Sequence, residues 1–219
     1  MTDASANLGV AASEKVAVVI VAAGRGARAG QANGPKQYQR IGGRAVITHT
    51  LDVFLRHPRT GPVVVAIHAD DVELFREAAG GHAERVTAVV GGATRQDSVR
   101  LGLLALKGYA PARVLIHDAV RPFVDAEVID RTIMAIGERQ GALPALPVAD
   151  TLKRESTTGM IDETVSRAGL HAAQTPQGFP FLAILEAHEK AHHMGRSDFT
   201  DDAAIAKWAR IPVKIVPGS

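Results

Sequence analysis

The sequence predicts a single α/β domain in which a parallel or mostly parallel sheet is covered by helices. Five short runs rich in valine, isoleucine and leucine recur along the chain, at residues 16–21, 63–67, 86–90, 113–117 and 142–146. Stretches with helical spacing separate successive runs, and buried strands that alternate with helices form parallel sheets. The 219 residues, 46% of them hydrophobic, match the size and composition of one such domain.

Helices are expected where apolar side chains recur on one helical face. Ile47, Leu51 and Phe54 have this spacing between the first two runs, and Val99 and Leu103 have it between the third and fourth. Ligands of parallel sheets bind outside the carboxyl ends of the strands. The segments that follow the strands are therefore the candidate binding loops: AAGRGAR at 22–28, VGGATRQDSV at 90–99 and HDAVRPF at 117–123.

The pattern changes after Asp150. Residues 151–154 and 163–167 are expected to be two short polar strands with too few apolar residues for a core of their own. We therefore predict a projecting arm at about 150–170 that a partner subunit covers. Helices are expected to follow at 179–192, with Pro180 near the first turn, and at 201–209, with acidic residues at the N-terminus.

Composition excludes several classes of function. The 25 basic and 23 acidic residues give a formal net charge of +2, too small for nonspecific nucleic-acid binding. The absence of cysteine excludes disulfides and thiolate nucleophiles and suits a reducing cytoplasm. The apolar run at 16–23 is far shorter than the roughly 20 residues that cross a membrane. Residues 1–13 are expected to be a flexible leader to a domain at 14–219.

The loop after the first strand satisfies the loose dinucleotide pattern GxGxxG/A with Gly24, Gly26 and Ala29. A dinucleotide fold enters its helix at this point, but glycine, asparagine and proline at 30–35 break any helix. We expect a wide loop whose backbone N–H groups wrap a triphosphate, with Arg28 and Lys36 adding two cations. The alternative is a tight turn with two solvated cations.

HDAVRP at 117–122 places Asp118 directly after a buried strand. A carboxylate at this position commonly holds a divalent cation through oxygen, which predicts Mg²⁺ beside the phosphates. Arg121 is expected to pair with Asp118 or to contact a second phosphate. His117 is interpreted as a structural histidine rather than a catalytic base. The alternative for Asp118 is a cap for the helix that starts near Asp125, but a proline intervenes.

VGGATRQDSV at 90–99 has two interpretations. Gly91 and Gly92 allow close approach of a ligand to the backbone, and Ser98 has a hydroxyl that can donate to a ribose or a base. Arg95, Asp97 and Ser98 also lie at the start of a helix, where such residues cap the first turn. The sequence does not separate these two roles.

A third set of polar residues lies in or beside short extended segments around the arm. Such residues suit recognition of a small phosphorylated polyol, and the alternative is arm and loop surface. The set comprises Asp150, Thr151, Lys153, Arg167, Thr175 and Gln177.

The motifs AAGRGAR, PKQY, GGATRQDSV, HDAVRPF, ADTLKR, TVSRAGL, AQTPQGF and FTDDA, in this order, resemble one family. This family is 2-C-methyl-D-erythritol 4-phosphate cytidylyltransferase of the non-mevalonate isoprenoid pathway, and the resemblance covers roughly residues 16–216. It implies a Rossmann-like nucleotidyltransferase fold, a three-layer sandwich with a protruding β-arm, that works as a cytoplasmic homodimer. The implied reaction transfers CMP from CTP to 2-C-methyl-D-erythritol 4-phosphate with magnesium.

The resemblance also implies residue roles. Arg28 and Lys36 match the transition-state stabilisers, Asp118 matches the magnesium-associated aspartate, and Arg167 is expected to act in both catalysis and acceptor binding. The CTP-binding positions are Ala22, Ala23, Gly24, Gly26, Gly91, Gly92, Ser98 and Ala119. The acceptor-binding positions are Arg121, Thr151, Arg167 and Thr175, some of them reaching across the dimer.

The sequence departs from the family pattern at its end. The family has a terminal strand with an Asn-x-Lys-x-Thr segment whose lysine positions the acceptor phosphate, whereas this chain stops after VPGS at 216–219. Two expectations follow: either the segment is absent from the chain, or the chain is part of something longer. The second resembles a fusion with 2-C-methyl-D-erythritol 2,4-cyclodiphosphate synthase.

The implied mechanism is in-line attack by an acceptor phosphate oxygen on the α-phosphorus of CTP, with pyrophosphate leaving. Because the acceptor phosphate is already ionised at neutral pH, no general base is needed, and positioning and electrostatics remain for the protein. A ribitol-5-phosphate or other polyol-phosphate cytidylyltransferase is the nearest alternative. A dinucleotide-dependent oxidoreductase and a non-catalytic nucleotide-binding protein are alternatives from other classes. Neither nucleic acid nor membrane is an expected partner.

Overall fold

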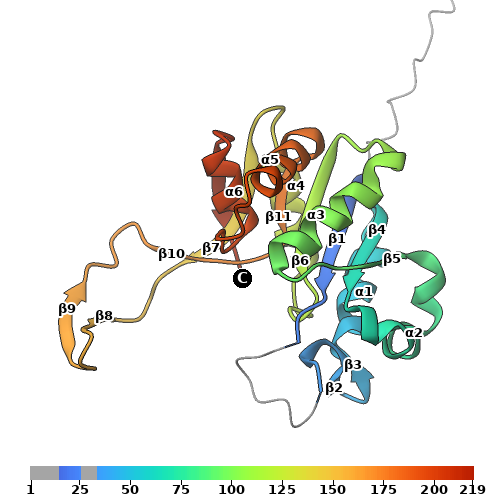
Figure 1. Cartoon of the computed structure of the whole chain (residues 1–219), viewed down its shortest axis with the longest axis horizontal. Coiled ribbons are helices and arrows are strands. Elements are labelled where there is room, and N and C mark those ends of the chain that lie inside the picture. Colours follow the sequence, from blue (N-terminus) through green and yellow to red (C-terminus); the bar gives the residue numbers. More distant parts are fainter. Residues whose placement is uncertain (1–14, 26–33) are drawn as a thin grey trace, which may run out of the picture.

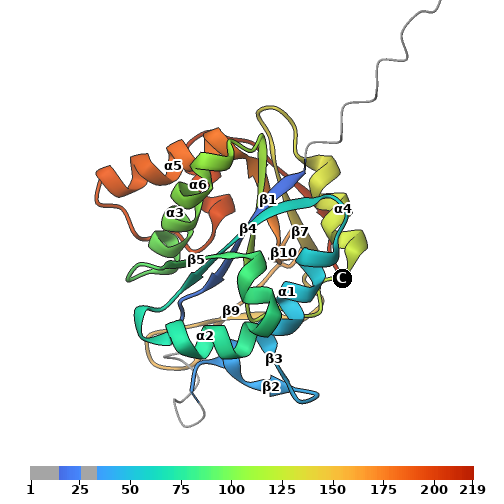
Figure 2. The same cartoon turned by 90° about the vertical axis from the view of Figure 1, so that its right-hand side faces the viewer.

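A computed structural model describes residues 15–25 and 34–219. The main body is a sheet with helices on both faces, and a thin hairpin projects from it (Figures 1 and 2). The leader predicted at 1–13 and the loop residues Gly26 and Arg28 lie outside the described residues.

The predicted strand runs all form strands, and the structure adds others. The strands are β1 (Val16–Ala22), β2 (Arg40–Ile41), β3 (Arg44–Ala45), β4 (Thr60–Ile67), β5 (Thr87–Val90), β6 (Arg113–Asp118), β7 (Gly141–Pro147), β8 (Leu152–Glu155), β9 (Ile161–Val165), β10 (His171–Ala173), β11 (Gln177–Pro180) and β12 (Val213–Pro217). The helices are α1 (Val46–Arg56), α2 (Val72–Ala79), α3 (Arg95–Leu106), α4 (Ala126–Ala135), α5 (Phe181–His193) and α6 (Asp202–Trp208).

The main sheet is mixed, with a parallel centre. Among the described residues its strand order is β10-β7-β11-β6-β1-β4-β5, and β12 pairs with β7. The central strand β1 is parallel to both β4 and β6, so that Ile20 pairs with Val65 and with His117. Strand β11 is antiparallel to β6 and β7, between which it lies. The carboxyl ends of β1, β4 and β6 therefore meet at one edge of the sheet.

The core has two layers because β1 is buried on both faces. Val18 and Ile20 belong to the cluster with Phe54 of α1, whereas Val19 points to the opposite face and packs with Leu103 of α3. This alternation is the two-residue period of a strand. Helices α1 and α4 cover one face, and α3 and α5 cover the other (Figure 2). A Cβ at Gly102 would lie 2.6 Å from Val19 Cγ1, so α3 packs this closely only with glycine there.

The prediction for residues 179–192 is wrong at its start. Phe179 belongs to β11 and pairs with Val114, and the helix α5 begins at Phe181 with Pro180 as the preceding residue. Phe179 is completely buried in the core. The apolar spacing continues from β11 into α5, so sequence periodicity does not mark this boundary. The helix predicted at 201–209 is confirmed as α6, and Asp201 caps it by accepting from Ala204 N–H at 2.9 Å.

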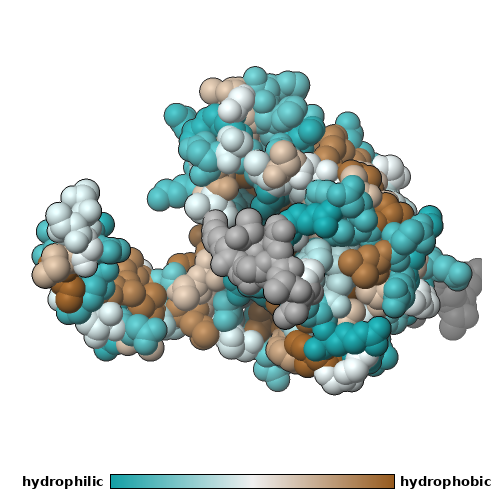
Figure 3. All heavy atoms as spheres, turned by 60° about the horizontal axis from the view of Figure 1, so that its bottom comes forward, coloured by the Kyte–Doolittle hydropathy of each residue, from teal (hydrophilic) through white to brown (hydrophobic). Residues whose placement is uncertain are grey.

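The arm is built as the sequence predicts, with shifted boundaries. Strands β8 and β9 form a separate antiparallel pair, in which Leu152 opposes Val165. They stand away from the body (Figure 1), and their surface mixes polar and apolar side chains (Figure 3). Met160 and Ile161 are 69% and 68% exposed, so the hairpin has no core of its own.

Within residues 15–25 and 34–219, every helix is either too short or too polar to span a bilayer.

Candidate active site at the carboxyl end of the sheet

A cavity of about 550 Å³ lies where β1 and β6 end. Its walls come from the loop after β1, the segment before and within the first turn of α3, the last residue of β6, and the 3₁₀ helix η2 (Lys36–Tyr38). The sequence-predicted residues among its lining are Ala22, Ala23, Gly24, Lys36, Gly92, Ser98 and Asp118. Three candidate loops that are distant in sequence therefore enclose one space.

The loop after β1 is fixed by a glutamine that the sequence interpretation missed. The buried Gln37 donates through Nε2 to the carbonyl of Ala22 at 2.6 Å and to that of Gly24 at 3.1 Å. Lys36, the preceding residue, is exposed and lines the cavity. The PKQ motif thus combines a side chain that holds the loop with one that faces the ligand space.

Arg25 belongs to the same cavity wall and was also missed. Its guanidinium pairs with Asp70 at 2.7 Å and with Asp71 at 3.2 Å, and it bonds to His68 Nδ1 at 2.8 Å. Because these partners follow β4, they tie the loop after β1 to the neighbouring strand end. The interpretation of the glycine-rich loop passed over Arg25 because its partners lie more than forty residues away.

At the start of α3, the structure shows which residue of VGGATRQDSV caps the helix. Thr94 is the N-cap residue, and its hydroxyl accepts from Asp97 N–H at 3.0 Å. Ser98 instead organises the loop: its hydroxyl donates to the Thr94 carbonyl at 2.9 Å and accepts from Gly92 N–H at 3.1 Å. A Cβ at Gly91 would lie 2.7 Å from both Ala23 Cβ and Ser98 Oγ, so packing within the chain requires glycine there.

Asp118 lies between two arginines. Its Oδ1 accepts from Arg95 Nε at 3.0 Å, and its Oδ2 accepts from Arg121 Nε at 3.4 Å, so the predicted pairing with Arg121 is confirmed. The capping alternative for Asp118 is excluded, because Asp125 caps α4 by accepting from Val128 N–H at 2.7 Å. Asp118 is thus a partly exposed carboxylate in the cavity wall whose charge is already shared with cations.

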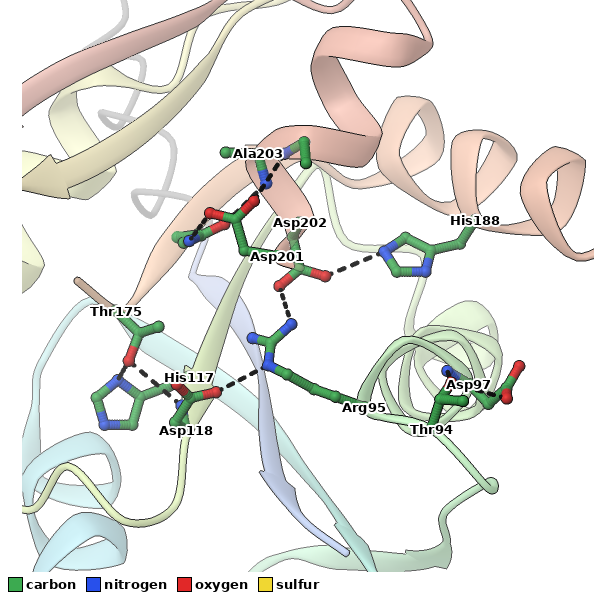
Figure 4. Close-up of polar contacts among 12 residues, drawn as sticks. Thr94, Arg95, Asp97, His117, Asp118, Thr175, His188, Asp201, Asp202 and Ala203 are labelled. Carbon is green, nitrogen blue, oxygen red and sulfur yellow. Dashed lines mark hydrogen bonds and ion pairs between the residues drawn. The ribbon is translucent and has the colours of Figure 1, made fainter. Parts of the chain in front are cut away.

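His117 behaves as a structural histidine in this arrangement. It is completely buried, and burial lowers its pKa to about 4. The Arg121 carbonyl lies 3.0 Å from Nε2 and can only accept, so Nε2 carries the proton. The other nitrogen, Nδ1, then accepts from the Thr175 hydroxyl at 3.0 Å, and that hydroxyl accepts from Asp118 N–H at 3.3 Å. Both ring nitrogens are therefore occupied by contacts within the chain, of which Figure 4 shows the one with Thr175.

The carboxylate in the cavity wall suits a magnesium ion that is held mainly by substrate phosphates. The described residues contain no group of three or more histidine, aspartate or glutamate side chains that could hold a metal by themselves. Asp118 supplies a single carboxylate in the cavity wall. Mg²⁺ typically binds through one or two carboxylates and completes its shell with substrate phosphates and water, so the residues present fit such an ion.

The four predicted acceptor residues do not come together within one chain. Arg121 and Thr175 line a second cavity of about 350 Å³, together with Val120, Phe123 and Ser219. Thr151 and Arg167 are exposed on or beside the arm, where Arg167 donates to the Ala149 carbonyl. Neither lines either cavity. Of the predicted CTP-binding residues, Ala119 is buried, and its N–H donates to the Val21 carbonyl at 3.0 Å.

A cavity at the carboxyl ends of parallel strands, with cations and one carboxylate in its walls, suits an α/β protein that binds a phosphorylated ligand. Residues 16–219 match the family model for 2-C-methyl-D-erythritol 4-phosphate cytidylyltransferase (IspD). The chain belongs to this family, and the resemblance seen in the sequence is confirmed.

Individual relatives agree with this assignment. The chain is 76% identical over 219 residues to the bifunctional enzyme IspD/IspF of Mesorhizobium japonicum, covering 100% of this chain and 53% of that protein. The corresponding enzyme of Brucella anthropi is 55% identical over 206 residues, with 94% and 51% covered. The chain thus spans about half the length of the curated relatives it matches.

Solved structures give the same fold. The 2-C-methyl-D-erythritol 4-phosphate cytidylyltransferase of Thermus thermophilus is similar with a TM-score of 0.75 and 32% identity, covering 94% of this chain and 89% of that one. A 4-diphosphocytidyl-2C-methyl-D-erythritol synthase from Anaerococcus prevotii has a TM-score of 0.78 and 30% identity, with 94% and 88% covered. The predicted Rossmann-like sandwich is confirmed.

Proposed function

We propose that the protein transfers CMP from CTP to 2-C-methyl-D-erythritol 4-phosphate, giving 4-diphosphocytidyl-2-C-methyl-D-erythritol and pyrophosphate. The observation that carries this proposal is the cavity after β1. Lys36, Ser98 and Asp118 line it together, in a chain that belongs to this family. Ala22, Ala23, Gly24 and Gly92 supply backbone around the same space. Gly26, Gly91, Ala119 and Arg28 complete the proposed CTP site on the strength of the family motifs alone.

The chemistry needs positioning and charge neutralisation more than proton transfer. A phosphate monoester attacks the α-phosphorus as an anion, and the residues that remain useful are cations. Lys36 is exposed at the cavity wall and neutralises charge that develops on the α-phosphate. The neutral His117, with both nitrogens engaged inside the chain, is unsuited to act as a base.

Asp118 is the proposed magnesium residue. When bound, Mg²⁺ supplies neutralisation of the triphosphate charge and fixes its geometry. Arg95 and Arg121 hold the two oxygens of the Asp118 carboxylate at the cavity wall.

For the acceptor we propose a site shared between two copies of the chain. Arg121 and Thr175 line the smaller cavity of the body, whereas Thr151 and Arg167 lie on or beside the exposed arm. The hairpin carries exposed Met160 and Ile161, and its two strands are almost entirely exposed. Its surface mixes polar and apolar side chains (Figure 3). A homodimer in which each arm covers its partner gives Thr151 and Arg167 access to the second copy's cavity. A cytoplasmic location accords with these anionic metabolites and with the absence of cysteine.

A panel of acceptors tests the proposal. CTP and Mg²⁺ are incubated with 2-C-methyl-D-erythritol 4-phosphate, ribitol 5-phosphate or glycerol 3-phosphate, and pyrophosphate release is measured. We expect kcat/KM for the methylerythritol phosphate to exceed the others by at least a hundredfold. Faster turnover of ribitol 5-phosphate would contradict the proposed acceptor but would still support a cytidylyltransferase. Absence of pyrophosphate release with every acceptor would contradict the class itself.

A further inference from the structure

A line of charged side chains runs from α6 to Asp118, the proposed magnesium residue (Figure 4). Asp202 Oδ2 accepts from Arg95 Nη1 at 2.9 Å, and Arg95 Nε donates to Asp118 Oδ1 at 3.0 Å. Arg95 thus lies between two carboxylates, one deep in the protein and one at the cavity. Asp202 belongs to α6, so this contact joins residues that are more than a hundred positions apart.

Asp202 is built as a permanent buried anion. Its side chain is completely buried, and its second oxygen accepts from His188 Nε2 at 3.1 Å. Burial acts to raise its pKa, but Arg95 and His188 outweigh burial and hold the pKa below its usual range. Removing only one partner of a buried ion pair is strongly unfavourable. A neutral side chain at position 202 would leave Arg95 with one anionic partner, Asp118, instead of two.

Arg95 can satisfy two anions only by dividing its donors between them. Nη1 is directed to Asp202, whereas Nε is directed to Asp118. The positive charge of Arg95 acts on both carboxylates, and the negative charge of Asp202 offsets part of it. Without Asp202, Arg95 would act on Asp118 as an uncompensated cation and would compete with any metal ion for that carboxylate.

We propose that Asp202 is a positioning residue that draws the charge of Arg95 away from Asp118 and so sets the affinity of Asp118 for a divalent cation. This inference rests on the proposed function, in which Asp118 holds magnesium. It assigns a purpose to an aspartate that touches neither cavity.

The test, without acceptor, compares binding of the Mn²⁺–CTP complex, measured by water proton relaxation, with binding of metal-free CTP, measured by titration calorimetry, to the protein with its full natural sequence. Asp202→Asn keeps the shape of the side chain and removes its charge. Because Mn²⁺–CTP carries a net negative charge, loss of the Asp202 charge favours the nucleotide while it disfavours the metal ion. The contribution of the metal is therefore the ratio of the dissociation constant of metal-free CTP to that of Mn²⁺–CTP, and in Asp202→Asn this ratio should fall on the order of tenfold. In turnover assays the half-saturating Mg²⁺ concentration should rise by a similar factor, while kcat at saturating Mg²⁺ stays within about threefold.

A second variant separates coupling from structural damage. Arg95 itself lines the cavity, so its own effect is measured with Arg95→Gln alone. In the Arg95→Gln background, adding Asp202→Asn should change the ratio by less than about threefold, because the cation that carries the effect is gone. The matched control is Asp52→Asn, which removes another buried carboxylate with a lowered pKa, held by Arg44 and His82. Asp52, Arg44 and His82 do not line the larger cavity, so Mn²⁺–CTP binding should not change in Asp52→Asn.

The outcomes distinguish this inference from the proposed function. Asp118→Asn should abolish measurable enhancement; if it does not, the magnesium assignment of the proposed function fails. If Asp118→Asn behaves as expected but Asp202→Asn leaves the ratio of the two dissociation constants within twofold of the original, the inference is overturned. It is equally overturned if Asp202→Asn lowers the ratio as much in the Arg95→Gln background as in the original protein, because the loss would then come from structure rather than from the charge of Arg95.

Discussion

The body of the protein and its arm use their polar residues in opposite ways. At the carboxyl end of the sheet, His117 and Gln37 are buried and fully engaged with partners in the same chain. On the arm, β8 and β9 are almost entirely exposed, and their polar contacts are local, such as Arg154 with Glu163. The body is therefore preorganised by itself, whereas the arm presents residues whose partners must come from elsewhere.

This difference shows where preorganisation resides. A catalytic group gains from being fixed before the substrate arrives, and buried hydrogen bonds provide such fixation. Exposed ion pairs contribute only about 0–1 kcal/mol and do not fix a side chain firmly. The arm residues Thr151 and Arg167 can become equally fixed only when a second surface covers them.

The largest effect is expected in the body, at Lys36. Lys36→Ala should lower kcat by roughly a hundredfold or more, the typical loss when one preorganised donor is removed, while the fold is retained because Lys36 is exposed. The measurement is pyrophosphate release at saturating CTP and acceptor. Lys207→Ala, on the exposed side of α6, is the matched control and should retain full activity. A Lys36→Ala variant with unchanged kcat would remove Lys36 from the mechanism.

A smaller effect concerns the pH dependence of stability. The pKa of His117 in the folded protein is lowered to about 4 by burial, below its unfolded value. Its stabilising contribution is therefore present above the unfolded pKa and is lost as the pH falls towards 4. Between pH 7 and pH 5 this amounts to about 2 kcal/mol of unfolding free energy.

Urea unfolding of the original protein and of His117→Gln isolates this term. The variant should be less stable at pH 7, but its stability should fall less steeply between pH 7 and pH 5, because the titrating group is gone. Other acidic and histidine residues contribute equally to both proteins. Parallel pH profiles would mean that His117 is protonated as readily in the folded state as in the unfolded one.

The arm is expected to give the smallest effect in a single variant and the sharpest test of the comparison. Arg167→Ala should raise KM for the methylerythritol phosphate by about tenfold, the loss of one charge-assisted contact, with kcat/KM for CTP little changed. If the arm serves the partner's site, mixing Arg167→Ala with Lys36→Ala chains creates heterodimers with one intact site. At an acceptor concentration well below KM, where Arg167→Ala alone keeps about a tenth of the activity, the mixture should then reach about a quarter of the original activity after subunit exchange. Without recovery, the arm acts on its own chain.

Much of the fold follows from local pattern. Strands buried on both faces must be apolar throughout, so the apolar runs that became β1, β4 and β6 are visible in the sequence. The run that became the edge strand β5 is also apolar, although most of that strand is exposed. Strand ends then mark the candidate loops, which is why Lys36 and Asp118 were found in advance. The boundary at Phe179 and Pro180 was missed because β11 is inserted antiparallel between β6 and β7, a pairing that no local period encodes.

The sequence by itself determined the layers, the loops that surround the cavity and the presence of an arm, because hydrophobic periodicity and strand ends are local properties. Tertiary structure alone decided the partners of the functional side chains. Gln37 donates to the loop after β1, and the Thr175 hydroxyl donates to His117. Asp202 accepts from Arg95, which lies more than a hundred residues away in the sequence. Such contacts depend on which distant segments the sheet brings together. The sequence gives the charge of a residue, but it does not give the charged partner that the residue has in the fold.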